Sequence, residues 1–234
     1  MIKILFVCHG NICRSPMAEF VTKDMVKRLG REEDFLVESA ATSSEELGNG
    51  VYPPIRRLLA SHGISCEGKT ARRLEREDYD RFDLILVMDE ENMVNTVRRL
   101  NGDPEGKVHN LLDFAGRIGE EIPDPWYTRQ FEDTWEDVTA GCLALLNALN
   151  QSRPVTLDFS ACEDRKALYR VMRAAMLWQE DYGSNLDALY DILTGLPYYG
   201  SSFRIIPPEN EALLDYTDRI ADIFEGAGVP VEIC

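Results

Sequence analysis

The chain has 234 residues, with 25 Lys and Arg against 41 Asp and Glu, which gives a formal net charge of −16 at pH 7. This charge disfavours nucleic acids and anionic membranes as partners, because both are negatively charged themselves. Hydrophobic residues make up 44% of the chain, yet no apolar run approaches the roughly 20 residues of a membrane span. The first residues lead directly into a predicted strand and not into a signal peptide. We therefore expect a cytoplasmic protein with one large domain or two ordinary ones.

The six cysteines are unevenly spaced, at positions 8, 13, 66, 142, 162 and 234. Neither a disulfide scaffold nor a zinc site has this spacing. We therefore expect free thiols in a reducing compartment, with no metal ion and no cofactor.

The chain opens with a strand, a loop and a helix. Residues 2–7 are apolar almost throughout, which is typical of a strand buried on both faces of a parallel sheet. Ser15 suits the cap of the following helix and Pro16 suits its first position. The helix then presents one apolar face, made of Met17, Val21, Met25 and Leu29.

Residues 8–15 form the loop between this strand and helix, and they are predicted to bind phosphate. Backbone N–H groups of such a loop can converge on an anion, and the helix N-terminus adds unpaired donors. Arg14 adds a planar guanidinium that can bind two phosphate oxygens at once. The same positive surroundings favour the thiolate of Cys8, which would be a nucleophile aimed at phosphorus. The loop lacks the Gly-Lys-Ser/Thr ending of a nucleotide-binding loop, and the simplest alternative is a turn with two buried cysteines.

Residues 7–16, Val-Cys-His-Gly-Asn-Ile-Cys-Arg-Ser-Pro, resemble the signature of low-molecular-weight protein-tyrosine phosphatases. The resemblance extends over residues 1–149 and implies that Cys8 is the nucleophile and that Arg14 binds the phosphate. The remaining loop residues would bind the phosphate as well: His9, Gly10, Asn11, Ile12, Cys13 and Ser15.

The resemblance also assigns supporting roles. A serine at the position of Ser39 supports the phosphate loop by hydrogen bonding, and the aspartate of a Met-Asp step, here Asp89, stabilises nearby loops. Cys13 would lie close enough to Cys8 to form a protective disulfide under oxidation.

Residues 123–127, Pro-Asp-Pro-Trp-Tyr, are the second chemical element. A phenolate that leaves phosphorus needs a proton, which a carboxylic acid can supply, and the two prolines restrict the backbone around Asp124. In the family that the chain resembles, this aspartate is the general acid, and Trp126 and Tyr127 would form walls for a flat substrate ring. Glu45 would line another wall, where the family commonly has an aromatic residue that helps to hold the ring.

Strands and helices alternate through the first 149 residues. This order predicts an α/β fold, a doubly wound four-stranded parallel sheet with the site at the carboxyl ends of its strands. The predicted strands are residues 2–7, 35–39, 84–87 and 108–112. The predicted helices are residues 16–29, 53–62, about ten residues after Asp89, and 132–149.

A second domain is predicted at residues 155–234, after a linker at residues 150–154 that is polar and ends in proline. About 80 residues of this kind can form a small α/β domain. The pattern predicts strands at 155–159, 203–206 and 229–233, a helix whose apolar face runs from Leu168 to Trp178, and a helix at 209–225.

Residues 182–195, Tyr-Gly-Ser-Asn-Leu-Asp-Ala-Leu-Tyr-Asp-Ile-Leu-Thr-Gly, resemble a segment of barstar, the intracellular inhibitor of the ribonuclease barnase. The resemblance implies a small α/β domain with a three-stranded parallel sheet. It also implies that Asp187 and Asp191, which share one helical face, bind a basic protein partner such as a ribonuclease. Asp181 stands where barstar has a contact tyrosine, and Tyr190 replaces a tryptophan. A solvated acidic helix on a docking domain is the alternative.

The predicted function is hydrolysis of protein phosphotyrosine through a thiophosphate intermediate. Arsenate reductases of similar fold use further cysteines soon after the Met-Asp step, and here none lies between Cys66 and Cys142. Protein-arginine phosphatases, which tend to carry threonine at the position of Ile12, are one alternative. The other is a binding protein in which the barstar-like domain has the main role.

Overall fold

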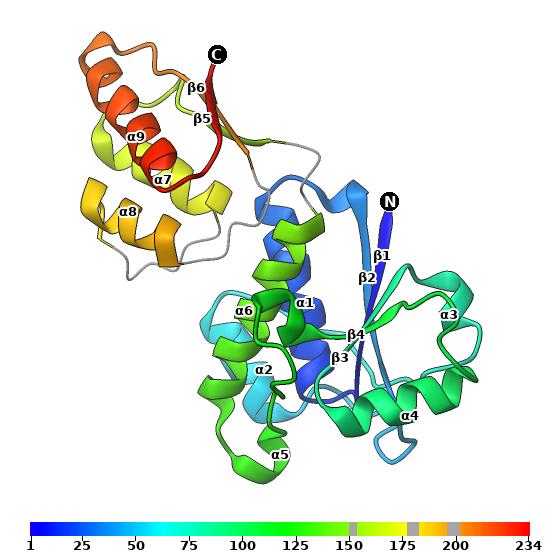
Figure 1. Ribbon diagram of the computed structural model, residues 1–234. Helices are drawn as coiled ribbons and strands as arrows, with labels where there is room; N and C mark the ends of the chain where they lie inside the picture. The colour runs from blue at the N-terminus through cyan, green and yellow to red at the C-terminus, as the bar shows by residue number, and fades with distance from the viewer. Residues whose placement is uncertain (150–153, 177–182, 196–201) are drawn as a thin grey trace. The chain divides into compact units, whose positions relative to one another are not determined.

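Figure 1 shows a computed structural model of the chain, in which residues 1–149, 154–176, 183–195 and 202–234 are described. The contacts divide the chain into two compact units, Met1–Leu145 and Leu146–Cys234. Each unit is described by itself below. Within the described residues, no helix is both long and apolar enough to cross a membrane.

The first unit is built on a four-stranded parallel sheet with the order β2-β1-β3-β4. Its strands are β1 (Ile2–Cys8), β2 (Phe35–Ala41), β3 (Leu84–Val87) and β4 (Val108–Asn110). Strand β1 lies in the middle of the sheet, and its residues 4–7 are fully buried, which explains their unbroken apolar run. The predicted parallel sheet is confirmed. Cys8, the last residue of β1, pairs in register with Ala41 at the end of β2.

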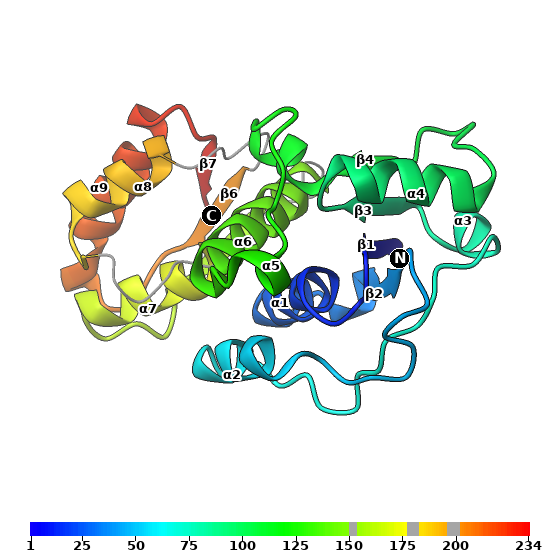
Figure 2. The ribbon, with the colours of Figure 1, turned by 90° about the horizontal axis from the view of Figure 1, so that it is seen from below.

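Helices cover both faces of this sheet (Figure 2). They are α1 (Arg14–Arg28), α2 (Pro53–Ser61), α3 (Asp78–Arg81), α4 (Glu90–Leu100), α5 (Pro125–Thr128) and α6 (Phe131–Leu149). Leu5, Val7 and their neighbours Ile85 and Val87 share one hydrophobic cluster with Leu100 of α4. The alternate strand residues face the opposite side, where α1 and α6 lie (Figure 2). The two-sided cover is that of a doubly wound sheet.

Two predicted boundaries in this unit are wrong. The first helix begins at Arg14 and not at Pro16, because the Ser15 hydroxyl contacts loop side chains and does not cap the helix. The fourth strand ends at Asn110, and a 3-10 helix follows at Leu111–Ala115. Leu111, the first residue of that turn, packs closely beside Gly141 of α6, where an added Cβ would lie 2.6 Å from Leu111 Cγ.

The second unit holds a three-stranded parallel sheet of order β5-β6-β7, as predicted. Its elements are β5 (Val155–Asp158), α7 (Arg165–Met176), α8 (Leu186–Gly195), β6 (Phe203–Ile206), α9 (Leu214–Gly226) and β7 (Val231–Ile233). Its core packs Leu157 and Phe203 of the sheet against Met172, Leu189 and Phe224 of the three helices.

The last predicted helix and strand are longer than the observed ones. The helix expected at 209–225 begins with a 3-10 turn, Glu211–Leu213, because the Asn210 side chain accepts a hydrogen bond from Ala212 N and caps that turn. The last strand begins at Val231 and not at residue 229. Trp178, Asp181 and residues 150–153 of the predicted linker lie outside the described residues.

Candidate active site

A small cavity of about 60 Å³ opens at the carboxyl end of β1. Its walls come from three segments that are far apart in the sequence: the loop after β1, residues 45–46 and the segment that begins at Asp124. The lining residues are Cys8, His9, Gly10, Ile12, Cys13, Glu45, Glu46, Asp124, Trp126 and Tyr127. The cavity therefore brings the predicted nucleophile, general acid and aromatic walls together.

The loop after β1 turns its carbonyl groups outward. The carbonyl oxygens of Cys8, His9 and Ile12 accept backbone hydrogen bonds from residues 42, 43 and 52, at 2.9 to 3.0 Å. The N–H of a trans peptide points away from its C=O, so the N–H groups of the residues that follow point away from these neighbours. Helix α1 also begins without a side-chain cap, so its first N–H groups are open to an anion.

Asn11 fixes the middle of the loop. Its φ of 56° lies in the left-handed region, which Asn tolerates better than most residues. Its side-chain amide donates to Ser15 Oγ at 2.9 Å and to Ser39 Oγ at 2.7 Å, while its Oδ1 accepts from the backbone N–H of Arg72 at 3.1 Å. Its own backbone N–H lies 3.3 Å from Cys8 Sγ. Asn11 thus holds the loop closed around the thiol.

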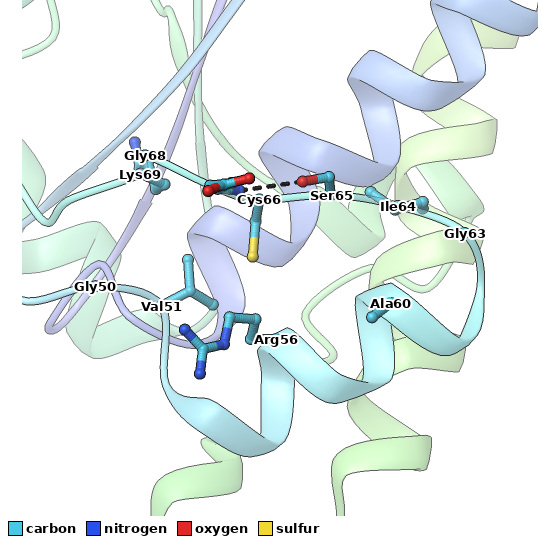
Figure 3. Close-up of a pocket in the computed structure, with 11 residues that line it drawn as sticks. Gly50, Val51, Arg56, Ala60, Gly63, Ile64, Ser65, Cys66, Gly68 and Lys69 are labelled. Carbon is cyan, nitrogen blue, oxygen red and sulfur yellow. Dashed lines mark hydrogen bonds between the residues drawn. The ribbon is translucent and has the colours of Figure 1, made fainter.

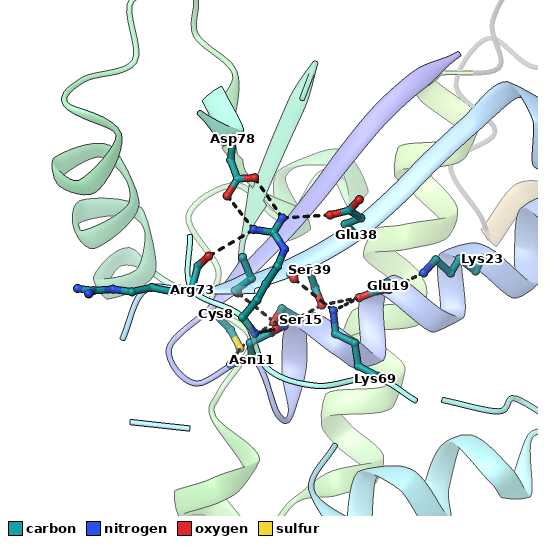
Figure 4. Close-up of polar contacts among 12 residues, drawn as sticks. Cys8, Asn11, Ser15, Glu19, Lys23, Glu38, Ser39, Lys69, Arg73 and Asp78 are labelled. Carbon is teal, nitrogen blue, oxygen red and sulfur yellow. Dashed lines mark hydrogen bonds and ion pairs between the residues drawn. The ribbon is translucent and has the colours of Figure 1, made fainter. Parts of the chain in front are cut away.

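A buried polar network continues behind the loop (Figure 4). Ser39 Oγ donates to Glu19 Oε2 at 2.5 Å, and Glu19 also pairs with Lys69 at 2.6 Å and Lys23 at 2.5 Å. Burial raises the pKa of Glu19, but the two lysine charges outweigh this effect and lower it overall. The network therefore keeps a charged carboxylate beneath Ser39.

Arg14 is 2% exposed and lies behind the cavity lining. Its guanidinium contacts Asp89 at 2.5 Å, Asp124 at 2.8 Å and the Ile122 carbonyl at 2.9 Å. Burial lowers the pKa of Arg14, but the negative charges of Cys8, Asp124 and Asp89 outweigh it, so the pKa is raised overall. Its Nε has no hydrogen-bond partner among the described residues. This buried donor is available to an anion.

Asp124 sits at the N-cap of α5, where its Oδ1 accepts from Trp126 N at 2.9 Å. Its other oxygen contacts Arg14, so both carboxylate oxygens are engaged. Trp126 is 40% exposed and Tyr127 79% exposed. Two aromatic rings therefore border the mouth of the cavity, next to a carboxyl group.

Polar side chains line the cavity as well. His9 Nε2 lies 3.3 Å from Glu45 Oε2, and Glu45 is largely exposed. Glu46 is held by Asn49 at 2.7 Å, and its side chain leaves little room beside Gly10, where an added Cβ would lie 3.2 Å from Glu46 Cγ. A side chain at position 10 would therefore require Glu46 to shift by a few tenths of an ångström.

All six cysteines are free thiols. Cys8 Sγ lies 3.1 Å from Ser15 Oγ. Burial, followed by the charges of Cys8 and Asp124, raises the pKa of Cys13 well above its usual range, so Cys13 stays protonated. The disulfide between Cys8 and Cys13 stays a prediction.

A larger cavity, of about 510 Å³, lies between α2 and residues 63–69 (Figure 3). The Cys66 thiol, the Val51 side chain and the Arg56 guanidinium face it. Burial outweighs the Arg56 charge and raises the pKa of the Cys66 thiol, which disfavours its thiolate. This cavity does not contain any of the predicted site residues.

In the second unit, Asp187 and Asp191 are both exposed on α8. Leu189 and Ile192, on the other side of the helix, are buried in the core. Tyr190 is 43% exposed. The two carboxylates thus share the solvent face, as their spacing of four predicts.

The family model described as "Low molecular weight phosphotyrosine protein phosphatase" matches residues 3–155. The chain belongs to this family. The model described as "Barstar (barnase inhibitor)" matches residues 152–229. The predicted fusion of a phosphatase with a barstar-like domain is confirmed.

Relatives and solved structures agree with this assignment. The low molecular weight protein-tyrosine-phosphatase YfkJ of Bacillus subtilis is 36% identical over 155 residues, which are 65% of this chain and 99% of the relative. Its crystal structure has a TM-score of 0.63 at 34% identity and covers 65% of this chain and 97% of that chain. The low molecular weight phosphatase SP-PTP of Streptococcus pyogenes has a TM-score of 0.57 at 37% identity, covering 64% and 93% of the two chains.

Two parts of the phosphatase site were not predicted. Asp89 was expected to stabilise loops; it also pairs with Arg14 and caps α4 through Asn92 N at 2.6 Å. Glu19 and Lys69 support Ser39, but the sequence pattern did not mark them as site residues. Glu19 is one polar residue in an amphipathic helix, and Lys69 is one polar residue in a loop. Within the described residues, no three His, Cys, Asp or Glu side chains converge as metal ligands.

Proposed function

We propose that this phosphatase hydrolyses phosphotyrosine in proteins, with Cys8, Arg14 and Asp124 as its catalytic residues. The observation that carries the proposal is their convergence around one cavity. A thiol and a carboxyl line it, and a buried guanidinium behind it has an unpartnered Nε. This set supplies a nucleophile, an anion-binding fork and a proton donor to the same reacting group.

In the first step, the Cys8 thiolate attacks phosphorus and the bond to the tyrosine oxygen breaks. The Asp124 carboxyl gives its proton to the departing phenolate, so tyrosine leaves as a neutral phenol. Arg14 and the loop N–H groups bind the three non-bridging oxygens. The Arg14 guanidinium also contacts Asp124 at 2.8 Å, so the phosphate would compete with this carboxylate for it.

In the second step, water attacks phosphorus in the thiophosphate. Asp124 accepts the proton from this water, the sulfur–phosphorus bond breaks, and inorganic phosphate leaves. Cys8 returns as thiolate and Asp124 as the acid, so the cycle closes without another reactant. The three loop N–H groups that point away from residues 42, 43 and 52 would stabilise the charge on the phosphoryl oxygens in both steps.

The cavity walls favour an aromatic phosphate ester. Trp126 and Tyr127 line the cavity and can contact a flat side chain. Phosphoarginine is the second candidate substrate, and Ile12 disfavours it because arginine phosphatases tend to carry threonine there. A solved structure of the YwlE arginine phosphatase, at 23% identity, shares the fold with this chain.

The test is phosphate release from matched phosphotyrosine, phosphoserine and phosphoarginine peptides. We expect the wild type to turn over phosphotyrosine and Cys8→Ser to show no turnover. Asp124→Ala should lower the turnover about 100-fold or more relative to the wild type. Cys66→Ser is the matched control, because Cys66 lies in the other cavity. Release of phosphate from the phosphoarginine peptide alone would reassign the substrate. If no peptide released phosphate in a Cys8-dependent way, the proposed enzymatic function would be contradicted.

For the barstar-like unit we propose that the α8 face binds a basic protein of the ribonuclease kind. Exposed Asp187 and Asp191 support this, because paired carboxylates can take the place of phosphates against a basic surface. The full chain should slow RNA hydrolysis by a purified barnase-type ribonuclease. Replacing both aspartates with alanine should weaken inhibition about 30-fold or more, while Asp218→Ala on α9 should not. No inhibition by the wild type would favour the docking-domain alternative.

A further inference from the structure

The segment that carries Asp124 is short and exposed, and its link to the start of α1 passes through the Arg14 guanidinium, which contacts Asp124 at 2.8 Å. Helix α5 has four residues, and Trp126, Tyr127 and Thr128 are all exposed. The prolines on either side of Asp124 restrict its backbone but do not tie it to the phosphate loop. A general acid must stay within hydrogen-bond reach of the leaving oxygen. Because Arg14 would also bind the phosphate, a contact that does not depend on Arg14 would keep this segment in place.

Tyr52 supplies such a contact. Its backbone N–H donates to the Ile12 carbonyl of the phosphate loop at 2.9 Å. Its ring packs against Trp126, with centroids 4.9 Å apart, and lies 6.1 Å from the ring of Phe131 at the start of α6. One residue therefore contacts both the loop that would hold the phosphate and the segment that would donate the proton.

Arg129 completes the arrangement. Its guanidinium donates to the Tyr52 hydroxyl at 2.7 Å and lies over the Trp126 ring, 5.5 Å from the centroid. Arg129 has a φ of 61° at the end of α5. A left-handed arginine costs about 1 kcal/mol, which glycine would avoid. From this position the guanidinium contacts two aromatic side chains.

We propose that Tyr52 and Arg129 form a clamp that positions Asp124 over the phosphate loop, and that they act as positioning residues for proton transfer. The inference rests on the proposed function, because it assigns how the general acid of that reaction is held. Neither side chain lines the cavity. Their effect on the reaction therefore passes through Trp126 and the α5 backbone to Asp124.

The clamp predicts a dependence on the leaving group. The second-order rate constant kcat/KM includes cleavage of the phosphorus–oxygen bond, and a poor leaving group needs the acid more than a good one does. In the full chain, Tyr52→Phe and Arg129→Gly should each lower kcat/KM for phenyl phosphate about tenfold. The same variants should lower kcat/KM only about twofold for p-nitrophenyl phosphate. Asp124→Asn, which removes the acid itself, should show the largest difference between the two substrates.

Two features separate positioning from a general structural effect. Arg129→Gly removes backbone strain, so its stability should equal or exceed that of the wild type while its activity on phenyl phosphate falls. The double variant should be no worse than Arg129→Gly alone, because Tyr52→Phe removes a hydrogen bond that Arg129→Gly removes as well. Asn101→Gly is the matched control: Asn101 is also left-handed at a helix end, and its variant should keep the wild-type ratio of the two substrates.

Hydrogen exchange gives a readout that does not need turnover. Tyr52→Phe should raise amide exchange in residues 124–129 and leave α4 unchanged. The clamp would be overturned if active variants kept the wild-type ratio of kcat/KM for the two substrates, as an equal fall for both would do. Unchanged amide exchange in Tyr52→Phe would overturn it as well. Absence of Cys8-dependent turnover in the wild type would instead overturn the proposed function, and the exchange result would still decide the clamp.

Discussion

The two sides of the cavity are held in different ways. The phosphate loop is buried, and Asn11 alone contacts Cys8, Ser15, Ser39 and Arg72 through its backbone and side chain. The rim is exposed: the Glu45 contact with His9 and the rings of Trp126 and Tyr127 face water. Buried hydrogen bonds fix geometry strongly, whereas exposed ion pairs contribute little. We therefore expect substitutions in the loop to cost more than substitutions at the rim.

The largest effect is expected from Arg14→Lys. A lysine keeps the positive charge but loses the planar fork that can bind two phosphate oxygens. We expect kcat to fall about 100- to 1000-fold, with the fold intact by circular dichroism. The control is Arg57→Lys on α2, which should leave kcat unchanged. A loss below tenfold would show that charge alone at position 14 suffices.

Glu19→Gln should have the next largest effect, on stability. Removing this buried carboxylate leaves the Lys69 charge without its carboxylate partner, which should cost about 3 kcal/mol in the free energy of unfolding. Urea unfolding measures this cost. Glu91→Gln, an exposed position on α4, is the control and should change stability by less than about 0.5 kcal/mol.

The same variant tests a pH dependence. The folded pKa of Glu19 lies below its unfolded value, which is about 4.3. Its ion pairs therefore stabilise the fold above that pH, and this stabilisation is lost as pH falls through the lowered folded pKa. The wild type should lose more stability than Glu19→Gln on acidification from neutral pH to below about 4. Parallel curves for the two proteins would contradict the charged network.

Asn11 separates backbone strain from hydrogen bonding. Asn11→Gly and Asn11→Ala both lose the side-chain contacts with Ser15 and Ser39, but only the alanine must adopt a φ near 56° against steric resistance. Both should lower kcat about tenfold, and the alanine variant should be less stable than the glycine variant by about 1 kcal/mol. Thermal unfolding and phosphotyrosine kinetics measure the two effects. Equal stabilities would show that the loop relaxes around alanine.

The smallest effect is expected at the rim. Glu45→Gln removes an exposed charge whose contact with His9 is worth at most about 1 kcal/mol. We expect kcat/KM for phosphotyrosine peptides to change about twofold, with a difference that shrinks as salt rises. A change above tenfold would mean that Glu45 binds substrate directly, and the comparison between loop and rim would then fail.

Local patterns predicted the fold well, because each depends on a short stretch of chain. The unbroken apolar run of residues 4–7 indicated a strand buried on both faces, and it is the centre of the sheet. The boundaries at Ser15 and Leu111 were predicted wrongly. In both places a tertiary contact determines where the element begins or ends. The Ser15 hydroxyl accepts a hydrogen bond from the Asn11 side chain in the loop, and Leu111 packs closely beside Gly141 of α6.

The sequence by itself determined the parallel α/β framework, the phosphatase signature of the loop, the acidic residue in the Pro-Asp-Pro segment and the barstar-like second unit. Only the tertiary structure decided which distant groups support the site. Lys69 pairs with Glu19 across 50 positions in the sequence, and Arg129 reaches Tyr52 across 77. No periodicity or motif encodes such contacts, because they depend on how separate elements approach one another once the sheet and its helices have packed.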